Sequence, residues 1–327
     1  MSTSVNGLLV GHSNAIHHLL QQIRQVAPTH APVLIRGEKG SGKNLVAQLI
    51  HQGSIRSDQP FIKLRCSEMP ANLLDEELLG HERGAIPGTR NARKGLLERT
   101  HGGTIFFDEI AVLAPSTQIK LLRVLQEREF EPPGGGKPVP VDVRLLAATQ
   151  HPLEQLVRNE AFREDLYYRL SVFPIQIPPL REHKSDIPAL TDHFLTKYAR
   201  LHGRTVKGVS APAMDLLTRH RWPGNVRELE ECIERAILAS TDGWIHIHHL
   251  SLTVQLDEAG GQPPWNLRTV LSHVEQEMIT DALRSCHGNM AAAARKLGLT
   301  ERMMGLRVHK YGIEFERFKP RHSVEHA

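Results

Sequence analysis

The sequence predicts an α/β domain followed by two all-helical parts. Between Ile35 and Phe173, short β-branched runs alternate with longer segments whose apolar residues recur at helical spacing. Continuous apolar strands between helices are typical of a mostly parallel sheet with helices on both faces. Five runs are the strand candidates: PVLIRG (32–37), PFIKLRC (60–66), GTIFFDE (103–109), VRLLAAT (143–149) and VFPIQIPP (172–179).

Shifts in composition suggest the domain boundaries. We expect the α/β domain at residues 8–180 and a small helical bundle at 181–252. A linker is expected at 253–266, because LDEAGGQPPWN is rich in Gly, Pro and acidic residues. The remaining stretch, 267–320, reads as a domain of three helices.

Composition narrows the class of protein. The 327 residues are 40% hydrophobic, and no apolar run approaches the ~20 residues of a membrane span. Because the N-terminus also lacks a secretory signal, we expect a cytoplasmic protein with no membrane partner. Three widely spaced cysteines, Cys66, Cys232 and Cys286, are expected to be free buried thiols. A net charge of +4 with 20 histidines permits a nucleic-acid partner.

A glycine-rich stretch, GEKGSGKN, follows the first strand candidate and opens a helix. In that context it predicts a P-loop, whose backbone amides surround phosphates at a helix N-terminus while Lys43 reaches the terminal phosphates. Asn44 stands where such loops usually carry a Ser or Thr magnesium ligand, and its amide oxygen would ligate weakly or through water. ATP and Mg²⁺ are the expected cofactors, and the binding residues are Gly37, Glu38, Lys39, Gly40, Ser41, Gly42, Lys43 and Asn44.

A strand that ends in two carboxylates, Asp108 and Glu109, supplies the second half of the nucleotide site. In P-loop ATPases the first carboxylate holds Mg²⁺ and the second orients the attacking water. Asp108 and Asn44 are therefore the expected metal ligands.

Downstream arginines complete the expected site. Arg163 and Arg169 are six residues apart on a predicted helix, from which they would reach the γ-phosphate of an adjacent subunit. The alternative is a pair of surface arginines bound to Glu164 and Asp165. Arg227 begins a later helix, a position suited to sensing nucleotide across a cleft.

The C-terminal segment GNMAAAARKLGLTERMMGLRVHKYGI predicts a helix-turn-helix. A helix of small residues is followed by a turn at Gly298 and by a second helix with Thr300 as its N-cap. A three-helix interaction bundle is the alternative. The expected DNA-binding residues are Thr300, Glu301, Arg302, Arg307, His309 and Lys310.

The histidine-rich segment WIHIHHL, residues 244–250, is expected to be a surface loop. It has no cysteine or carboxylate at metal-ligand spacing.

Six motifs resemble, in their order and spacing, the AAA+ domain of sigma-54-dependent transcription activators. They are GEKGSGKN, LLGHERGA, GGTIFFDEI, FREDLYYRL, IPPLRE and WPGNVRELE. The resemblance covers residues 8–250, and the segment beyond resembles a Fis-type domain. It implies an AAA+ P-loop parallel sheet, an all-α lid and a C-terminal helix-turn-helix. It also implies an ATP-promoted homo-oligomer, usually a hexamer, in which a neighbour completes each site. By this resemblance Lys43, Asp108 and Glu109 are Walker residues, Thr149 lies at sensor one, Arg163 and Arg169 are arginine fingers, and Arg227 is the sensor-two arginine.

The same resemblance aligns residues 84–89 with the family's GAFTGA loop, which ATP hydrolysis raises against sigma-54. Here the Phe is replaced by Ile86 and the Thr by Pro87, and proline lacks an amide donor and fixes φ. The expected sigma-54 contact loop is Gly84, Ala85, Ile86, Pro87, Gly88 and Thr89.

Two further departures are Arg65 and Gln150, each in place of a family Asn. Arg65 is expected to pair with Glu109 and slow hydrolysis.

The expected function is ATP-driven remodelling of sigma-54 RNA polymerase by a regulator that binds double-stranded DNA at an upstream activator site. One alternative is an ATP- and DNA-binding regulator, or a subunit of a mixed ring, that does not itself remodel sigma-54. Another is an AAA+ enzyme of a different class, such as an unfoldase or a helicase loader. No sensory domain precedes the P-loop, so control is expected from a regulatory protein partner, from expression level or from a lost domain.

Overall fold

The computed structural model describes residues 9–81, 93–133, 137–256 and 267–318. The chain forms two compact units, Met1–Val254 and Gln255–Ala327, and each is described by itself. Among the described helices, none is both long and apolar enough to span a bilayer.

A five-stranded parallel sheet forms the centre of the first unit, with strand order β2-β5-β8-β1-β9. Its strands are β2 (Phe61–Arg65), β5 (Thr104–Asp108), β8 (Arg144–Thr149), β1 (Val33–Arg36) and β9 (Phe173–Gln176). Each of the five predicted runs contains one of these strands, so the predicted parallel sheet is confirmed. Because all the strands run the same way, β5 and β8 bring Asp108 and Thr149 to the edge from which the P-loop leaves β1.

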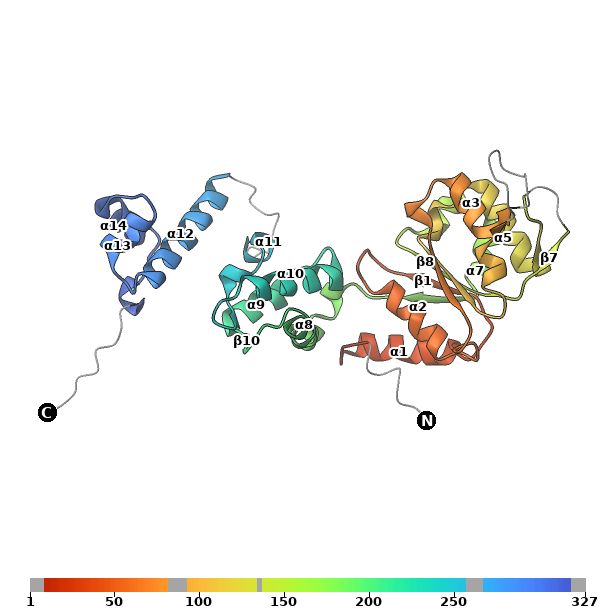
Figure 1. Cartoon of the computed structure of the whole chain (residues 1–327), viewed down its shortest axis with the longest axis horizontal. Coiled ribbons are helices and arrows are strands. Elements are labelled where there is room, and N and C mark those ends of the chain that lie inside the picture. The colour runs from red at the N-terminus through yellow and green to blue at the C-terminus, as the bar shows by residue number, and fades with distance from the viewer. Residues whose placement is uncertain (1–8, 82–92, 134–136, 257–266, 319–327) are drawn as a thin grey trace. The chain divides into compact units, whose positions relative to one another are not determined.

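Helices bury both faces of this sheet (Figure 1). On β5, Phe106 packs in one apolar cluster with residues of α1 and α2, whereas Ile105 and Phe107 pack in another with residues of α3, α5 and α7. This alternation follows from the two-residue period of a strand. The helices are α1 (Asn14–Val26), α2 (Lys43–Gln52), α3 (Ala71–Leu79), α4 (Leu96–Arg99), α5 (Pro115–Glu127), α6 (Leu153–Arg158) and α7 (Glu164–Leu170).

Short antiparallel strands flank the segment that was expected to contact sigma-54. Here β3 (Gly80–His81) pairs with β4 (Arg93–Lys94), between α3 and α4. Gly80 has φ 71°, which ends α3. Residues 84–89 themselves lie outside the described residues. A second antiparallel pair joins β6 (Glu129–Phe130) and β7 (Val139–Pro140).

A second apolar core holds the helical bundle that follows the sheet. Leu190, Phe194 and Tyr198 line one face of α8 and meet Leu229 and Ile233 of α10 in that core. Its helices are α8 (Ile187–Leu201), α9 (Ala211–Arg219), α10 (Asn225–Ala239) and α11 (Leu252–Leu256), with a two-stranded parallel pair, β10 (Gly208–Val209) and β11 (Trp244–Ile245).

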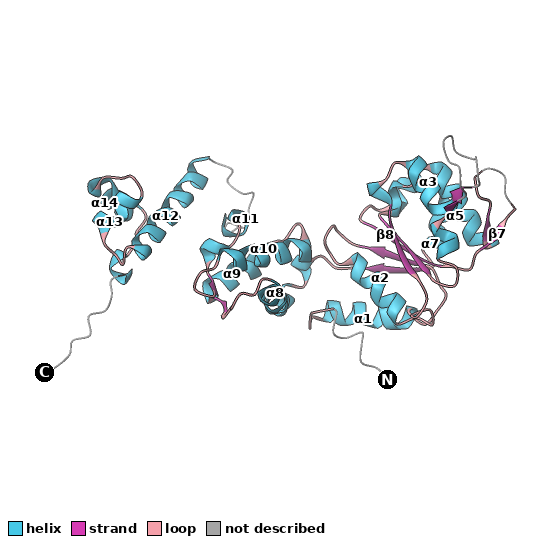
Figure 2. Cartoon of the chain, viewed as in Figure 1, coloured by secondary structure: helices cyan, strands magenta, loops and turns pink. Residues whose placement is uncertain are grey.

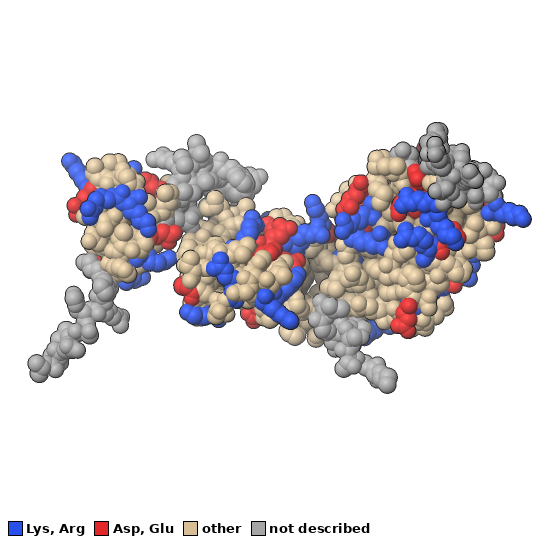
Figure 3. Space-filling view, viewed as in Figure 1, with Lys and Arg blue, Asp and Glu red and all other residues tan. Residues whose placement is uncertain are grey.

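The C-terminal unit is helical, with α12 (Leu267–Ser285), α13 (Met290–Lys296) and α14 (Glu301–Lys310) in its described part (Figure 2). The side chains of Asn289 and Thr300 cap α13 and α14, and Gly298, at φ 65°, lies in the turn between them. This geometry confirms the predicted helix-turn-helix. Lys and Arg side chains gather on the visible face of the unit around α13 and α14 (Figure 3).

Candidate functional site

The P-loop lies between β1 and α2, as predicted, and its glycines are required by the backbone. Gly42 is the N-cap of α2 with φ 100°, and Gly40 has φ 77°. A Cβ added to Gly40 would lie 2.1 Å from the carbonyl oxygen of Gly224, at the start of α10. A side chain at Gly40 would therefore separate the P-loop from the helical bundle.

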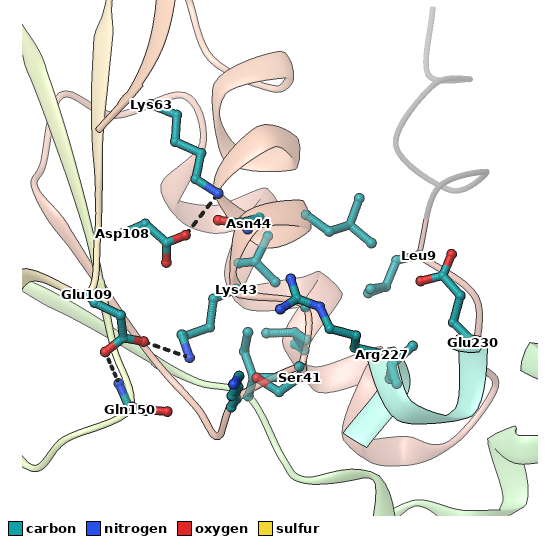
Figure 4. Close-up of a pocket in the computed structure, with 18 of the residues that line it drawn as sticks. Leu9, Ser41, Lys43, Asn44, Lys63, Asp108, Glu109, Gln150, Arg227 and Glu230 are labelled. Atoms are coloured by element: carbon teal, nitrogen blue, oxygen red, sulfur yellow. Dashed lines mark hydrogen bonds and ion pairs between the residues drawn. The ribbon is translucent and has the colours of Figure 1, made fainter. Parts of the chain in front are cut away.

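A cavity of about 750 Å³ opens at this loop. One side carries Lys43, Asp108 and Glu109, and the other carries Leu9 and Arg227, so both the sheet and the helical bundle contribute to it (Figure 4). Its size is that of a cofactor site.

Lys43 is buried and held in place by three oxygens. Its Nζ donates to the carbonyl oxygens of Gly37 (2.9 Å) and Glu38 (3.2 Å) and lies 3.3 Å from Oε1 of Glu109. Glu109 has left-handed backbone dihedrals, φ 63° and ψ 58°, directly after β5. Its Oε2 accepts a hydrogen bond from the backbone N–H of Gln150, at 3.2 Å. The predicted Lys43 and Glu109 therefore meet at one point of the sheet edge.

Asp108 has a partner that the sequence reasoning missed. Its Oδ2 lies 2.8 Å from Nζ of Lys63, which comes from the neighbouring strand β2. Finding this pair from sequence requires the strand order, because β2 and β5 are adjacent in the sheet but separated by α3 and α4 along the chain. Lys63 therefore supplies positive charge beside the expected metal ligand.

Arg65 does not contact Glu109, so the expected pairing is wrong. Its guanidinium donates to both carboxylate oxygens of Glu68, at 2.9 and 3.1 Å, because the turn after β2 brings Glu68 back toward it. Lys43 and Gln150 hold Glu109 instead. The structure thus removes the contact by which Arg65 was expected to slow hydrolysis.

Thr149, the residue expected at sensor one, is buried at the end of β8. Its hydroxyl accepts from the N–H of His151 (2.9 Å) and donates to the carbonyl oxygen of the same residue (3.1 Å). Its own carbonyl oxygen accepts from the N–H of Gly37, at 3.2 Å. This bond ties the end of β8 to the start of the P-loop.

Arg163 and Arg169 both lie on the surface, but only Arg169 belongs to α7. Arg163 is the N-cap residue, with extended dihedrals, because its N–H donates to Oε1 of Gln118 before the helix begins. Its placement on the helix was therefore wrong. Its side chain pairs with Asp165, at 3.0 and 2.7 Å, as in the surface alternative. No hydrogen bond or ion pair engages exposed Arg169 among the described residues.

Arg227 is near the start of α10, as predicted. Its backbone N–H donates to the carbonyl oxygen of Gly40, at 3.3 Å, and its exposed side chain lines the cavity opposite Lys43 (Figure 4). The P-loop and the helical bundle therefore meet at this residue.

Two buried polar atoms at the loop lack a partner in the described part of the protein. They are Oγ of Ser41 and Oδ1 of Asn44, and both residues line the cavity. Buried polar atoms are nearly always hydrogen-bonded, so these positions fit a ligand rich in oxygen and its metal ion. Nowhere in the described ranges do three or more His, Cys, Asp or Glu side chains group to hold a metal on their own.

The histidine-rich segment has regular secondary structure, whereas the sequence predicted a surface loop. It contains β11 and a 3-10 turn at Ile247–His249, and Nε2 of His246 lies 3.0 Å from Oδ2 of Asp242. A hydrogen bond from the backbone N–H of Trp244 lowers the pKa of Asp242 to about 2, and the contact with His246 adds to this effect.

The residues expected to bind DNA divide into two groups. Arg307 and Lys310 pair with Glu275 of α12, which also accepts a 2.5 Å hydrogen bond from the hydroxyl of Tyr311. Hydrogen bonds from Tyr311 and Arg307 lower the pKa of Glu275. Thr300 caps the helix, and no side-chain hydrogen bond or ion pair engages the exposed Glu301, Arg302 and His309 within the described residues. Arg302 is therefore available to contact a base edge of DNA, whereas Arg307 and Lys310 are paired with Glu275.

A P-loop at the carboxyl edge of a parallel sheet, closed by a helical lid that presents an arginine, defines an AAA+ nucleotide-binding protein. The chain belongs to the family of sigma-54-dependent transcription activators. Residues 9–176 match the sigma-54 interaction domain, residues 181–264 the AAA+ ATPase lid domain, and residues 270–311 the bacterial regulatory protein, Fis family. The resemblance noted from the sequence motifs is thereby confirmed.

Similar proteins support this assignment. Nitrogen fixation protein AnfA of Azotobacter vinelandii is 46% identical over 311 residues, which are 95% of this chain and 58% of AnfA. The chain therefore spans little more than half of that relative. NtrX of Brucella abortus in complex with ADP is similar with TM-score 0.72 and 33% identity, covering 93% of this chain and 70% of NtrX. Its complex with ATP gives TM-score 0.70 and 33% identity, covering 94% and 70%.

Proposed function

We propose that this chain binds ATP in the cavity beside Lys43 and hydrolyses it in an oligomeric ring, usually a hexamer in this family. The work of hydrolysis would remodel sigma-54 RNA polymerase from an upstream DNA site, in the cytoplasm where the polymerase acts. The observation that carries the proposal is the convergence of Lys43, Glu109 and Arg227 on one cavity. The nucleotide complexes of NtrX support the choice of ligand.

Each side chain at the sheet edge has a distinct part in this proposal. Lys43, already surrounded by oxygens, supplies positive charge for the terminal phosphates. Glu109 accepts a hydrogen bond from Gln150 and would orient the attacking water. Asn44 and Asp108 would hold Mg²⁺, which neutralises charge on the phosphate oxygens when bound.

Arginines from a neighbouring copy complete the proposed site. Arg169 is exposed and unpaired within the described residues, so its guanidinium is available to another subunit. Arg163 would exchange Asp165 for phosphate, which costs little because exposed ion pairs are weak. Arg227 would sense the nucleotide from the lid.

The C-terminal unit would supply the upstream DNA site. Thr300 caps the N-terminus of α14, and the exposed Arg302 lies in the first turn of this helix, a geometry suited to the major groove. The exposed Glu301 and His309 would also contact the DNA, and Arg307 and Lys310 would bind its phosphates. A regulatory protein remains a proposed partner.

Open-complex formation tests the proposal. Sigma-54 holoenzyme on a supercoiled promoter is mixed with the chain and ATP, and melted template is measured. We expect melting with ATP, none with ADP, and at most a few per cent of it with Glu109→Gln. ATP hydrolysis without any melting would contradict remodelling. It would instead support the second candidate, an ATP- and DNA-binding subunit, which Pro87 in place of the family's Thr favours.

A further inference from the structure

A buried carboxylate, Asp186, fastens the N-terminal segment of the first unit to the lid. It ends the 3-10 turn Lys184–Asp186, directly before α8, and is 1% exposed. Its Oδ1 accepts hydrogen bonds from the backbone N–H groups of His12 (2.6 Å) and Ser13 (2.8 Å). Its Oδ2 lies 3.0 Å from Nδ1 of His183. One side chain thus holds a segment more than 170 residues away in sequence.

The backbone of this segment is shaped to admit the carboxylate. Gly11 has φ 153°, and a Cβ built there would lie 3.0 Å from Oδ2 of Asp186. A side chain at Gly11 would therefore be strained and would crowd the carboxylate. Burial raises the pKa of Asp186, but hydrogen bonds from Ser13, His12 and His183 outweigh it and lower the pKa, so the group stays ionised.

The fastened segment forms one wall of the nucleotide cavity. Leu9 and Val10 precede Gly11 and line the cavity, and Leu9 lies across it from Lys43 (Figure 4). Leu9 packs against the core that contains α1 and α2, whereas Val10 packs against the core of the lid. Phe194 and Leu190 of α8 also line this cavity. This wall is apolar and is suited to a flat apolar base.

We propose that Asp186 is a positioning residue for recognition of the base, acting through the backbone of His12 and Ser13. The carboxylate fixes the backbone that follows Leu9 and Val10, with Leu9 against the core of α1 and α2 and Val10 against the core of the lid, so that the wall for the base exists before nucleotide arrives. Lys43 and the P-loop amides bind the triphosphate independently of this contact. The inference rests on the proposed nucleotide binding. It adds that Asp186 affects binding of the base and not of the phosphates.

The test compares two ligands that share phosphates but differ in the base. Binding of ATP and of inorganic tripolyphosphate, both with Mg²⁺, is measured by calorimetry on the full chain. Because Asp186→Ala removes two charge-assisted hydrogen bonds to the wall, we expect about tenfold weaker ATP binding. Tripolyphosphate binding should change by less than about twofold, since the P-loop is untouched. Asp186→Asn keeps an acceptor for His12 and Ser13 and should recover most of the ATP affinity.

Two further variants keep the test decisive. Gly11→Ala disturbs the contact from the other side and should reproduce the selective loss of ATP affinity, even where Asp186→Ala does not fold. Asp192→Ala removes an exposed carboxylate from the same α8 and should bind both ligands like the wild type. Equal losses for ATP and tripolyphosphate, or no loss for ATP, would overturn the inference. Failure of the wild-type chain to bind ATP would instead overturn the proposed function.

Discussion

Glu38 of the P-loop and Arg181, which lies 143 residues further along the chain, form an ion pair with two hydrogen bonds of 2.7 Å each. Asn225 of α10 adds a hydrogen bond to the same carboxylate, at 3.1 Å. These contacts lower the pKa of Glu38 to about 2, chiefly through Arg181 and then through Asn225. The P-loop, the connection to the lid and the start of α10 therefore meet at one acidic side chain.

This pair predicts a pH dependence of stability. A carboxylate whose pKa is lower in the folded state stabilises the fold above its unfolded pKa of ~4.3 and loses that contribution as pH falls toward 2. Glu38→Gln should thus lower the free energy of urea unfolding at pH 7, by about 1 kcal/mol or less because the pair is half-exposed. The difference from wild type should shrink between pH 4.5 and pH 2. A difference that stays constant across this range would argue against the pair.

Glu109 predicts a separation of binding from hydrolysis. Glu109→Gln keeps the size of the side chain but removes the carboxylate that would orient water, so ATP turnover should fall about a hundredfold or more. ATP affinity should stay within a few fold, because Lys43 keeps its contacts with Gly37 and Glu38. Steady-state hydrolysis and equilibrium binding measure the two effects. Lys43→Ala is the contrasting control and should weaken binding itself.

Glu275 predicts how the C-terminal unit distributes its positive charge. Glu275→Gln would release Arg307 and Lys310, so affinity for duplex DNA at low salt should rise and its salt dependence should steepen by about one or two phosphate contacts. Asp281→Asn removes the same charge from the same helix, away from these residues, and is the matched control. Fluorescence anisotropy over a series of salt concentrations measures both. Equal effects of the two variants would show that only net charge matters.

The exposed position of Arg302 predicts that this side chain recognises the base sequence of the DNA site. Arg302→Ala should cost about 1–3 kcal/mol on a specific site and much less on random duplex, since base contacts specify and phosphate contacts position. Lys310→Ala should weaken both duplexes to a similar, smaller extent. Competition binding against a selected operator tests this, and equal losses on both duplexes for Arg302→Ala would count against base readout.

The altered contact loop predicts a gain of function. The double variant Ile86→Phe, Pro87→Thr restores an aromatic ring, a hydroxyl and an amide donor at positions where the family carries Phe and Thr. Open-complex formation with sigma-54 holoenzyme should increase several fold while ATP hydrolysis per chain stays unchanged. An increase in hydrolysis with no increase in melting would place the defect outside the loop.

Local patterns predicted the sheet and much of the site. The β-branched runs predicted the strands. A strand followed by a glycine-rich loop and then a helix predicted the position of Lys43. Thr300 was identified as a cap because capping depends on residues only three apart.

Contacts across the chain were beyond local patterns. Lys63 reaches Asp108 only because β2 lies beside β5, and Asp186 reaches Ser13 only once the lid is placed. Arg163 and Arg65 were misjudged for the converse reason. Each finds a partner a few residues away, and a short turn rather than a helix or a long-range contact decides its geometry.

Complementation in a mixed ring tests the central claim most directly, namely that arginines of one copy complete the ATP site of the next. One chain carries Glu109→Gln and the other carries Arg163→Ala with Arg169→Ala, and ATP turnover is measured for each alone and for an equal mixture. We predict that both chains are nearly inactive alone and that the mixture recovers about a quarter of wild-type turnover. With random assembly, about a quarter of the interfaces combine an intact Glu109 in one subunit with intact arginines in its neighbour. A mixture no more active than the two chains alone would contradict the account.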